Sequence, residues 1–151
     1  MVAGNLEAAI RGWFRHLEAC VRAVDYQAAR PIFAPEVVGF GTFGAILEGL
    51  EVLVADQWRN VWPNIEAFTF DLDTLHWGAE GDLAWAVCVW NSQGRRADGT
   101  AFPRPGRATV ILQRRADAWL AVHTHFSLFP SELGSRRSSQ VGGRESRPSF
   151  R

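Results

Sequence analysis

RATVILQRRADAWLAVHTHFSLFP, residues 107–130, carries β-branched and aromatic residues on both sides of a short break. Such residues favour strands, and the pattern predicts one strand over 108–114 and a second over 119–127. Residues 116–118 form the predicted turn, and Pro130 ends the second strand because proline has no N–H to give to a ladder. The stretch therefore predicts a β-hairpin.

Side chains alternate between the two faces of a strand, so the second strand can be sorted by face. One face would carry Leu120, Val122, Thr124 and Phe126, and the other would carry Trp119, Ala121, His123, His125 and Ser127. The first set is suited to a core. The second set contains two histidines that project from one face.

His123 and His125 are candidates for a metal site or an acid–base pair. A metal also needs third and fourth ligands, and neither the two remaining histidines nor the cysteine spacing completes such a set. We therefore expect no metal or other cofactor. The pair is expected on an outer sheet face, hydrogen-bonded or packed against a partner subunit.

Periodicity and breaker residues define the elements upstream of this hairpin. The first half of the chain contains a helix over 6–24, an irregular second helix over 26–33 that contains Pro31, and short strands over 37–42 and 46–47. A third helix begins after Gly49 and stops at Pro63. Strands over 65–77 and 83–91 and a polar loop over 93–105 follow. The apolar register of the 65–77 strand slips near Asp73, which predicts a bulge.

Helices that precede a meander of strands indicate an α+β domain, with a curved antiparallel sheet covered by helices on one face. The sheet would comprise a short hairpin and four long strands. Residues 1–130 form the predicted domain. Residues 131–151 are rich in Ser, Arg and Gly and poor in apolar side chains, so we expect a disordered tail.

Composition excludes several classes of protein. The chain of 151 residues fits one domain, and 47% of it is hydrophobic. Sixteen basic residues balance sixteen acidic ones, so neither a nucleic acid nor an anionic membrane is an expected partner. No apolar run could span a bilayer, and no secretory signal is apparent. Cys20 and Cys88 lie in apolar segments and are expected to be reduced core thiols, which favours a cytoplasmic location.

The closing sequence Trp119-Leu-Ala-Val-His-Thr-His-Phe-Ser127 resembles that of the SnoaL-like proteins of the nuclear transport factor 2-like superfamily. The runs Gly106-Arg-Ala-Thr and Gly81-Asp-Leu-Ala-Trp-Ala fit the same resemblance, which covers about residues 6–130. It implies a cone-shaped sheet with three helices on the concave face, as in ketosteroid isomerase and in the association domain of calcium/calmodulin-dependent kinase II. It does not imply one activity, because this fold carries many functions.

The interior of the cone is the predicted ligand site. Its expected lining residues are Trp13, Phe40, Gln57, Trp58, Phe70, Trp90, Val110, Thr124 and Phe126. Gln57 and Thr124 are the polar anchors of this otherwise aromatic set, which suits an apolar or flat small molecule. The alternative is that the same side chains simply fill a solid core.

Acid–base chemistry of the ketosteroid isomerase kind needs a carboxylate base and a neutral hydrogen-bond donor. The position that would hold the base corresponds to Gly39 or Phe40, and the only tyrosine is Tyr26. We therefore do not expect steroid isomerase activity. Arg107, on the histidine face, is either a rim residue for an anion or an interface residue.

Two functions remain open. The first is a SnoaL-like small-molecule-binding protein, with isomerase, cyclase or hydrolase chemistry as its catalytic options. The second is a non-catalytic dimerisation or assembly module. A homodimer is expected through the outer sheet face, where Trp77, Trp85, Ile111 and Trp119 would otherwise leave an apolar patch in water.

Overall fold

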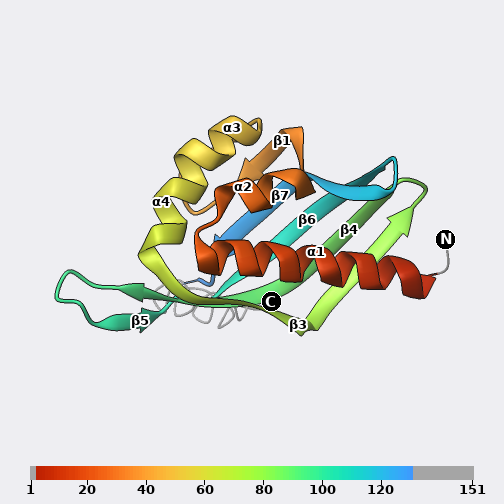
Figure 1. Ribbon diagram of the computed structural model, residues 1–151. Helices are drawn as coiled ribbons and strands as arrows, with labels where there is room; N and C mark the ends of the chain where they lie inside the picture. Colours follow the sequence, from red (N-terminus) through yellow and green to blue (C-terminus); the bar gives the residue numbers. More distant parts are fainter. Residues whose placement is uncertain (1–2, 131–151) are drawn as a thin grey trace, which may run out of the picture.

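Helices cover one face of a curved seven-stranded sheet in the computed structural model, which describes residues 3–130 (Figure 1). The helical elements are α1 (Ala3–Ala23), α2 (Tyr26–Ala29), α3 (Leu50–Val52) and α4 (Arg59–Val61), with 3₁₀ turns at Arg30–Ile32 and Trp62–Asn64 and a π-helical segment, Leu53–Trp58, that joins α3 to α4. The strands are β1 (Phe33–Phe40), β2 (Leu47–Glu48), β3 (Ile65–Glu80), β4 (Leu83–Arg95), β5 (Ala101–Pro103), β6 (Gly106–Arg115) and β7 (Ala118–Leu128).

The predicted α+β class and the three helical regions on the concave face are confirmed. The strand order is β2-β1-β7-β6-β4-β3, with β5 paired to β4. The sheet is mixed rather than wholly antiparallel, because β1 runs parallel to β7. Side-chain alternation is the same in parallel and antiparallel strands, so the sequence pattern cannot reveal this pairing.

Helix α1 packs along β3, an edge strand of the sheet. Its apolar stripe is buried, and Ile10 and Phe14 are completely inaccessible to solvent. Arg22 donates a hydrogen bond of 2.6 Å to the Phe68 carbonyl, and the Glu18 carboxylate accepts one of 2.7 Å from the Phe70 N–H. The helix therefore satisfies backbone groups that an uncovered edge strand would leave exposed.

The bulge predicted near Asp73 is present in β3. Asp71 pairs with Val89 and His76 pairs with Val87, so the residues between them loop out of the ladder. The Thr74 hydroxyl accepts from the Val89 N–H at 2.9 Å and donates to the Asp71 carbonyl at 2.6 Å. A side chain thus replaces the missing ladder hydrogen bonds.

A second bulge lies in β7 and was not predicted. Ile111 pairs with His123, whereas Leu112 pairs with Ala121, which leaves Val122 without a partner residue. A slip of one residue exchanges the two faces of a strand. Ala121 is consequently buried and Trp119 packs against the core, although the simple alternation placed both on the outer face.

Two further expectations from the sequence are corrected. The predicted loop over 93–105 contains the end of β4 and the strand β5, which form an arm beyond the main sheet (Figure 1). The second helix gives way to a 3₁₀ turn at Arg30, and β1 begins at Phe33 rather than at residue 37. Pro31 cannot donate the next helical hydrogen bond, which accounts for the early end.

Both cysteines are free and buried, Cys20 in α1 and Cys88 in β4. Burial raises the pKa of the Cys88 thiol to about 12, and the nearby Asp71 charge adds to this effect. Burial likewise raises the pKa of Cys20. Neither thiol is an activated nucleophile, because the thiolate is the reactive form.

Within residues 3–130, no helix has both the length and the apolar character needed to cross a membrane. The predicted tail over 131–151 lies outside the described residues, so the domain boundary near Pro130 stays a prediction.

Candidate ligand site between the helices and the sheet

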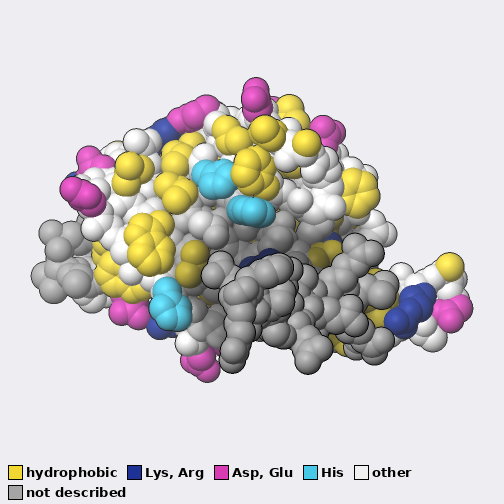
Figure 2. All heavy atoms as spheres, turned by 180° about the vertical axis from the view of Figure 1, so that it is seen from behind, with side chains coloured by type: hydrophobic (Ala, Val, Ile, Leu, Met, Phe, Trp, Pro, Cys, Tyr) yellow, Lys and Arg dark blue, Asp and Glu magenta, His cyan; other side chains and the backbone are white. Residues whose placement is uncertain are grey.

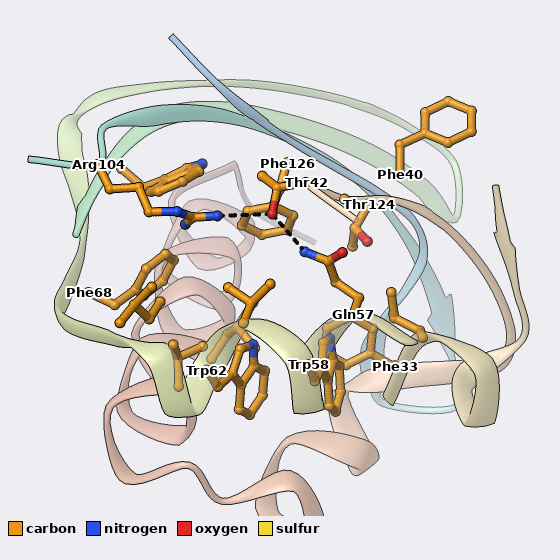
Figure 3. Close-up of a pocket in the computed structure, with 17 residues that line it drawn as sticks. Phe33, Phe40, Thr42, Gln57, Trp58, Trp62, Phe68, Arg104, Thr124 and Phe126 are labelled. Atoms are coloured by element: carbon orange, nitrogen blue, oxygen red, sulfur yellow. Dashed lines mark hydrogen bonds between the residues drawn. The ribbon is translucent and has the colours of Figure 1, made fainter. Parts of the chain in front are cut away.

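A cavity lies between the inner face of the sheet and the helical segment 53–62 (Figure 3). The cavity is partly open to solvent and has a volume of about 50 Å³. The lining residues are Leu17, Val21, Phe33, Phe40, Gly41, Thr42, Leu53, Gln57, Trp58, Val61, Trp62, Ile65, Phe68, Trp90, Arg104, Thr124 and Phe126.

Aromatic rings form the helical wall of this cavity. Trp58 and Trp62 are stacked, with ring centroids 4.6 Å apart, and Phe33 meets Trp58 edge-on at 4.9 Å. The wider π-helical turn at Leu53–Trp58 buries Leu53, Val54, Gln57 and Trp58 together. π-Helical turns of this kind are frequent at functional sites. The wall is therefore apolar and held by ring-to-ring contacts.

A chain of hydrogen bonds crosses the cavity above the rings. The Gln57 amide donates to the Thr42 hydroxyl at 3.3 Å, and Arg104 donates to the same hydroxyl at 2.9 Å (Figure 3). The Phe43 N–H donates to the Gln57 side-chain carbonyl at 2.9 Å. Gly41 permits this arrangement, because a Cβ there would lie 2.2 Å from the Gln57 side chain. These residues make the polar rim of the site.

Trp90 contributes a donor to the sheet wall. Its side chain is 1% exposed and packs near Phe68 and Phe126, with centroid separations of 5.6 and 6.4 Å. Among the described residues, its indole N–H has no hydrogen-bond partner. A buried donor without a partner is costly, so this group marks a place where an acceptor is missing.

Arg104 is the only ionisable side chain among the described lining residues. It is partly buried, and desolvation lowers the pKa of its guanidinium from the ordinary arginine value. Its guanidinium lies over the Trp90 ring, 5.6 Å from the centroid. Backbone hydrogen bonds with Ser92, of 2.8 and 3.1 Å, fix the position of the residue.

The predicted ligand-binding residues divide into three groups. Gln57, Trp58, Trp90, Thr124 and Phe126 line the cavity. Trp13, Phe70 and Val110 do not line it and are buried in the core around it. Phe40 borders the cavity, but its ring points away from it (Figure 3) and meets His123 and His125 at 5.2 and 5.3 Å. Gly39 occupies the inward position of β1 beside Thr124, so its neighbour Phe40 turns outward.

The sequence reasoning missed Thr42 and Arg104. Thr42 lies two residues beyond the end of β1, so its position at the rim depends on where that strand ends. Arg104 lies in the segment 93–105, which the sequence predicts to be a polar loop. Only its pairing with Ser92, twelve residues earlier, brings it to the cavity. No local pattern distinguishes it from the exposed Arg95 and Arg96.

His123, His125 and Arg107 lie on the opposite face of the sheet. His123 Nδ1 donates to the Val38 carbonyl at 2.7 Å, which requires the proton on that nitrogen. Arg107 is exposed and pairs with Ser127. Figure 2 shows histidine side chains surrounded by apolar ones on this side of the molecule. Within residues 3–130, no three His, Cys, Asp or Glu side chains are grouped as metal ligands would be.

Solved structures share this fold. A nuclear transport factor 2-like superfamily protein from Salmonella enterica superposes with a TM-score of 0.74 at 17% identity, covering 87% of this chain and 96% of its own. A ketosteroid isomerase-like protein from Erwinia carotovora gives a TM-score of 0.68 at 15% identity, and the superposition covers 82% of this chain and 96% of that protein. A nuclear transport factor 2-like protein of unknown function from Pseudomonas putida gives a TM-score of 0.68 at 26% identity. The superposition covers 89% of this chain and 94% of that protein.

No protein with a curated description matches this sequence. The model of the SnoaL-like domain matches residues 7–132, which includes every strand of the sheet and nearly all of α1. The fold, the cavity between helices and sheet, and this match lead to one conclusion: the chain belongs to the SnoaL-like domain family.

Proposed function

We propose that the protein binds a small molecule with a flat, apolar body in the cavity between α1, the 53–62 segment and the sheet. This proposal is carried by stacked rings in the wall of one partly open cavity that also includes Trp90, whose indole N–H has no partner among residues 3–130. Concave, mostly apolar sites with a few placed polar groups are typical ligand sites.

The lining supports binding rather than acid–base catalysis. Among the described lining residues there is no carboxylate, imidazole or phenol, and the single ionisable group is an arginine. A general base must lie within hydrogen-bond reach of the proton it removes. The structural likeness to the ketosteroid isomerase-like protein therefore does not support isomerase chemistry in this cavity.

A bound ligand should raise the melting temperature, because it stabilises only the native state. At a concentration of one hundred times Kd, the expected gain is about 2.7 kcal/mol. The measurement is differential scanning fluorimetry with a panel of small aromatic and alicyclic compounds, both neutral and charged.

Two valine variants on the same helical stretch provide the control. Val61 lines the cavity, so Val61→Phe should fill it and remove the shift that a ligand causes. Val52 is 40% exposed and lies outside the cavity, so Val52→Phe should leave the shift unchanged. Equal shifts in both variants would place ligand binding elsewhere and contradict the proposal.

A second candidate function is self-association through the outer sheet face. Trp85 is 46% exposed and Leu83 is 49% exposed, and both project from β4 on this face beside Ile111. Trp77 and Trp119, also predicted for this patch, instead pack against the core. The remaining cluster still places large apolar side chains in water, which favours a partner surface.

We predict a homodimer that depends on this cluster. Sedimentation velocity at micromolar concentration should give a dimer for the unaltered protein and a monomer for the Trp85→Asp/Ile111→Asp variant, because a buried charge without a partner disfavours an interface. Val52→Asp, on the helical side, should remain dimeric. A monomeric unaltered protein would rule out this surface as a dimer interface.

A further inference from the structure

We propose that the ligand of this cavity is a small monocarboxylic acid with a flat ring, whose carboxylate binds Arg104 while the ring lies against the aromatic wall. This inference rests on the proposed function and adds the chemical class of the ligand. It is carried by two features of the described residues: a partly buried arginine that has no acidic partner among them, and a buried indole N–H that has no acceptor among them.

Among the described arginines, Arg104 is the one that is partly buried and forms no ion pair, since the others without an ion pair are exposed. Arg11, Arg15, Arg30, Arg95, Arg114 and Arg115 each form an ion pair with an Asp or Glu. Arg104, although partly desolvated, has no carboxylate within ion-pair distance among residues 3–130, and its side chain bonds only to the Thr42 hydroxyl. A charge withdrawn from water needs a counter-charge, so the arrangement favours an anion that comes from outside.

The Trp90 side chain lies next to Arg104. The Arg104 guanidinium carbon lies 5.6 Å from the Trp90 ring centroid, and the indole N–H is buried and unpartnered among the described residues. A carboxylate has two oxygens and accepts several hydrogen bonds, whereas a neutral carbonyl has one oxygen. One carboxylate can therefore take a charge-assisted bond from Arg104 and still accept a second hydrogen bond from a neighbouring donor.

The remaining lining restricts the charge and the body of the ligand. One cation faces a cavity whose other walls are rings, aliphatic side chains and the neutral groups of Gln57, Thr42 and Thr124. A ligand with a single negative charge balances the one positive charge of the lining. A phosphate or a dicarboxylate would bury additional negative charge without compensation. The part of the wall that Trp58 and Trp62 form is aromatic, which suits an aromatic or alicyclic ring.

The experiment compares acids with their neutral isosteres. Benzoate, phenylacetate and cyclohexanecarboxylate are each titrated by calorimetry beside benzamide, phenylacetamide and cyclohexanecarboxamide. We expect at least one acid to bind about tenfold or more tightly than its amide. In Arg104→Gln, the affinity for the acid should fall to that for the amide, while the affinity for the amide should be unchanged.

Arg107→Gln is the matched control, since Arg107 is three residues away but lies exposed on the outer face. It should retain the full preference for the acid. Trp90→Phe keeps an aromatic ring and removes the indole N–H. It should lower the affinity for the acid while Arg104 stays in place.

The outcomes separate this inference from the proposed function. If amides bind as tightly as acids and Arg104→Gln changes nothing, the cavity is a ligand site but the carboxylate assignment is wrong. If Arg107→Gln removes the preference and Arg104→Gln does not, the anion binds on the outer face and the inference is also wrong. If no compound binds and none shifts the melting temperature of the unaltered protein, both the inference and the proposed function fail.

Discussion

Replacement of Trp90 by alanine should destabilise the protein by about 3–5 kcal/mol, the range for a large aromatic residue removed from a core. Trp90 is 1% exposed, and it packs between Phe68 and Phe126 on one side and the Arg104 guanidinium on another. The loss has two sources: the transfer free energy of the indole, and the cavity left beside rings that cannot collapse into it. Urea unfolding followed by circular dichroism measures the free energy.

Trp90→Phe is the companion variant, and it should cost much less. It retains an aromatic ring at the same position and removes an N–H that has no partner among the described residues. Loss of an unsatisfied buried donor offsets part of the lost packing, since such a group costs about 1–3 kcal/mol. If Trp90→Phe and Trp90→Ala unfold at the same urea concentration, packing of the aromatic ring is not the source of the stability that Trp90 contributes.

Gly106→Ala should be the most disruptive change of a single methyl group in the sheet. A Cβ at Gly106 would lie 2.2 Å from the Trp90 ring and 2.3 Å from the Ser127 carbonyl oxygen. The second contact is with backbone of the paired strand β7, so no rotamer change relieves it. Overpacking of this kind costs about 1–3 kcal/mol or more, and here it also moves Trp90 in the wall of the cavity. The measured quantities are the free energy of unfolding and ligand affinity, and both should fall.

Gly12→Ala is the matched control for this variant. Gly12 lies in the middle of α1, is exposed, and has nothing within 4 Å of the position that a Cβ would take. The same substitution should therefore stabilise the protein by about 0.5–1 kcal/mol, because alanine favours the helix over glycine. A stabilising effect of Gly106→Ala would mean that β6 and β7 can separate at this point.

The elements that follow from local sequence were predictable. The periodic stripe of α1 fixes its buried face, because apolar residues at spacings of three and four lie on one side of a helix. The β6–β7 hairpin follows from two strand-forming runs joined by a short turn, and the bulge in β3 from the shift in apolar register near Asp73. Each of these depends on residues that are close together in the chain.

Part of the candidate site was predictable for the same reason. Trp58, Trp90, Thr124 and Phe126 were placed by alternation and periodicity, and all four line the cavity. Trp13, Phe70 and Val110 were assigned to the same interior, and the sequence cannot say which interior residues border a space and which pack solidly. That distinction depends on how distant elements meet.

Residue order alone thus determined the α+β class, the helical cover of one sheet face and the aromatic character of the interior, since each arises from a pattern within one element. Tertiary structure decided the parallel β1–β7 pairing, the Val122 bulge that exchanges faces in β7, and the arrival of Arg104 beside Trp90. These features join segments far apart in the chain, so their geometry is set by packing and by backbone hydrogen bonds between strands. Thr42 and Arg104 belong to this second group, because contacts between distant segments bring them to the cavity.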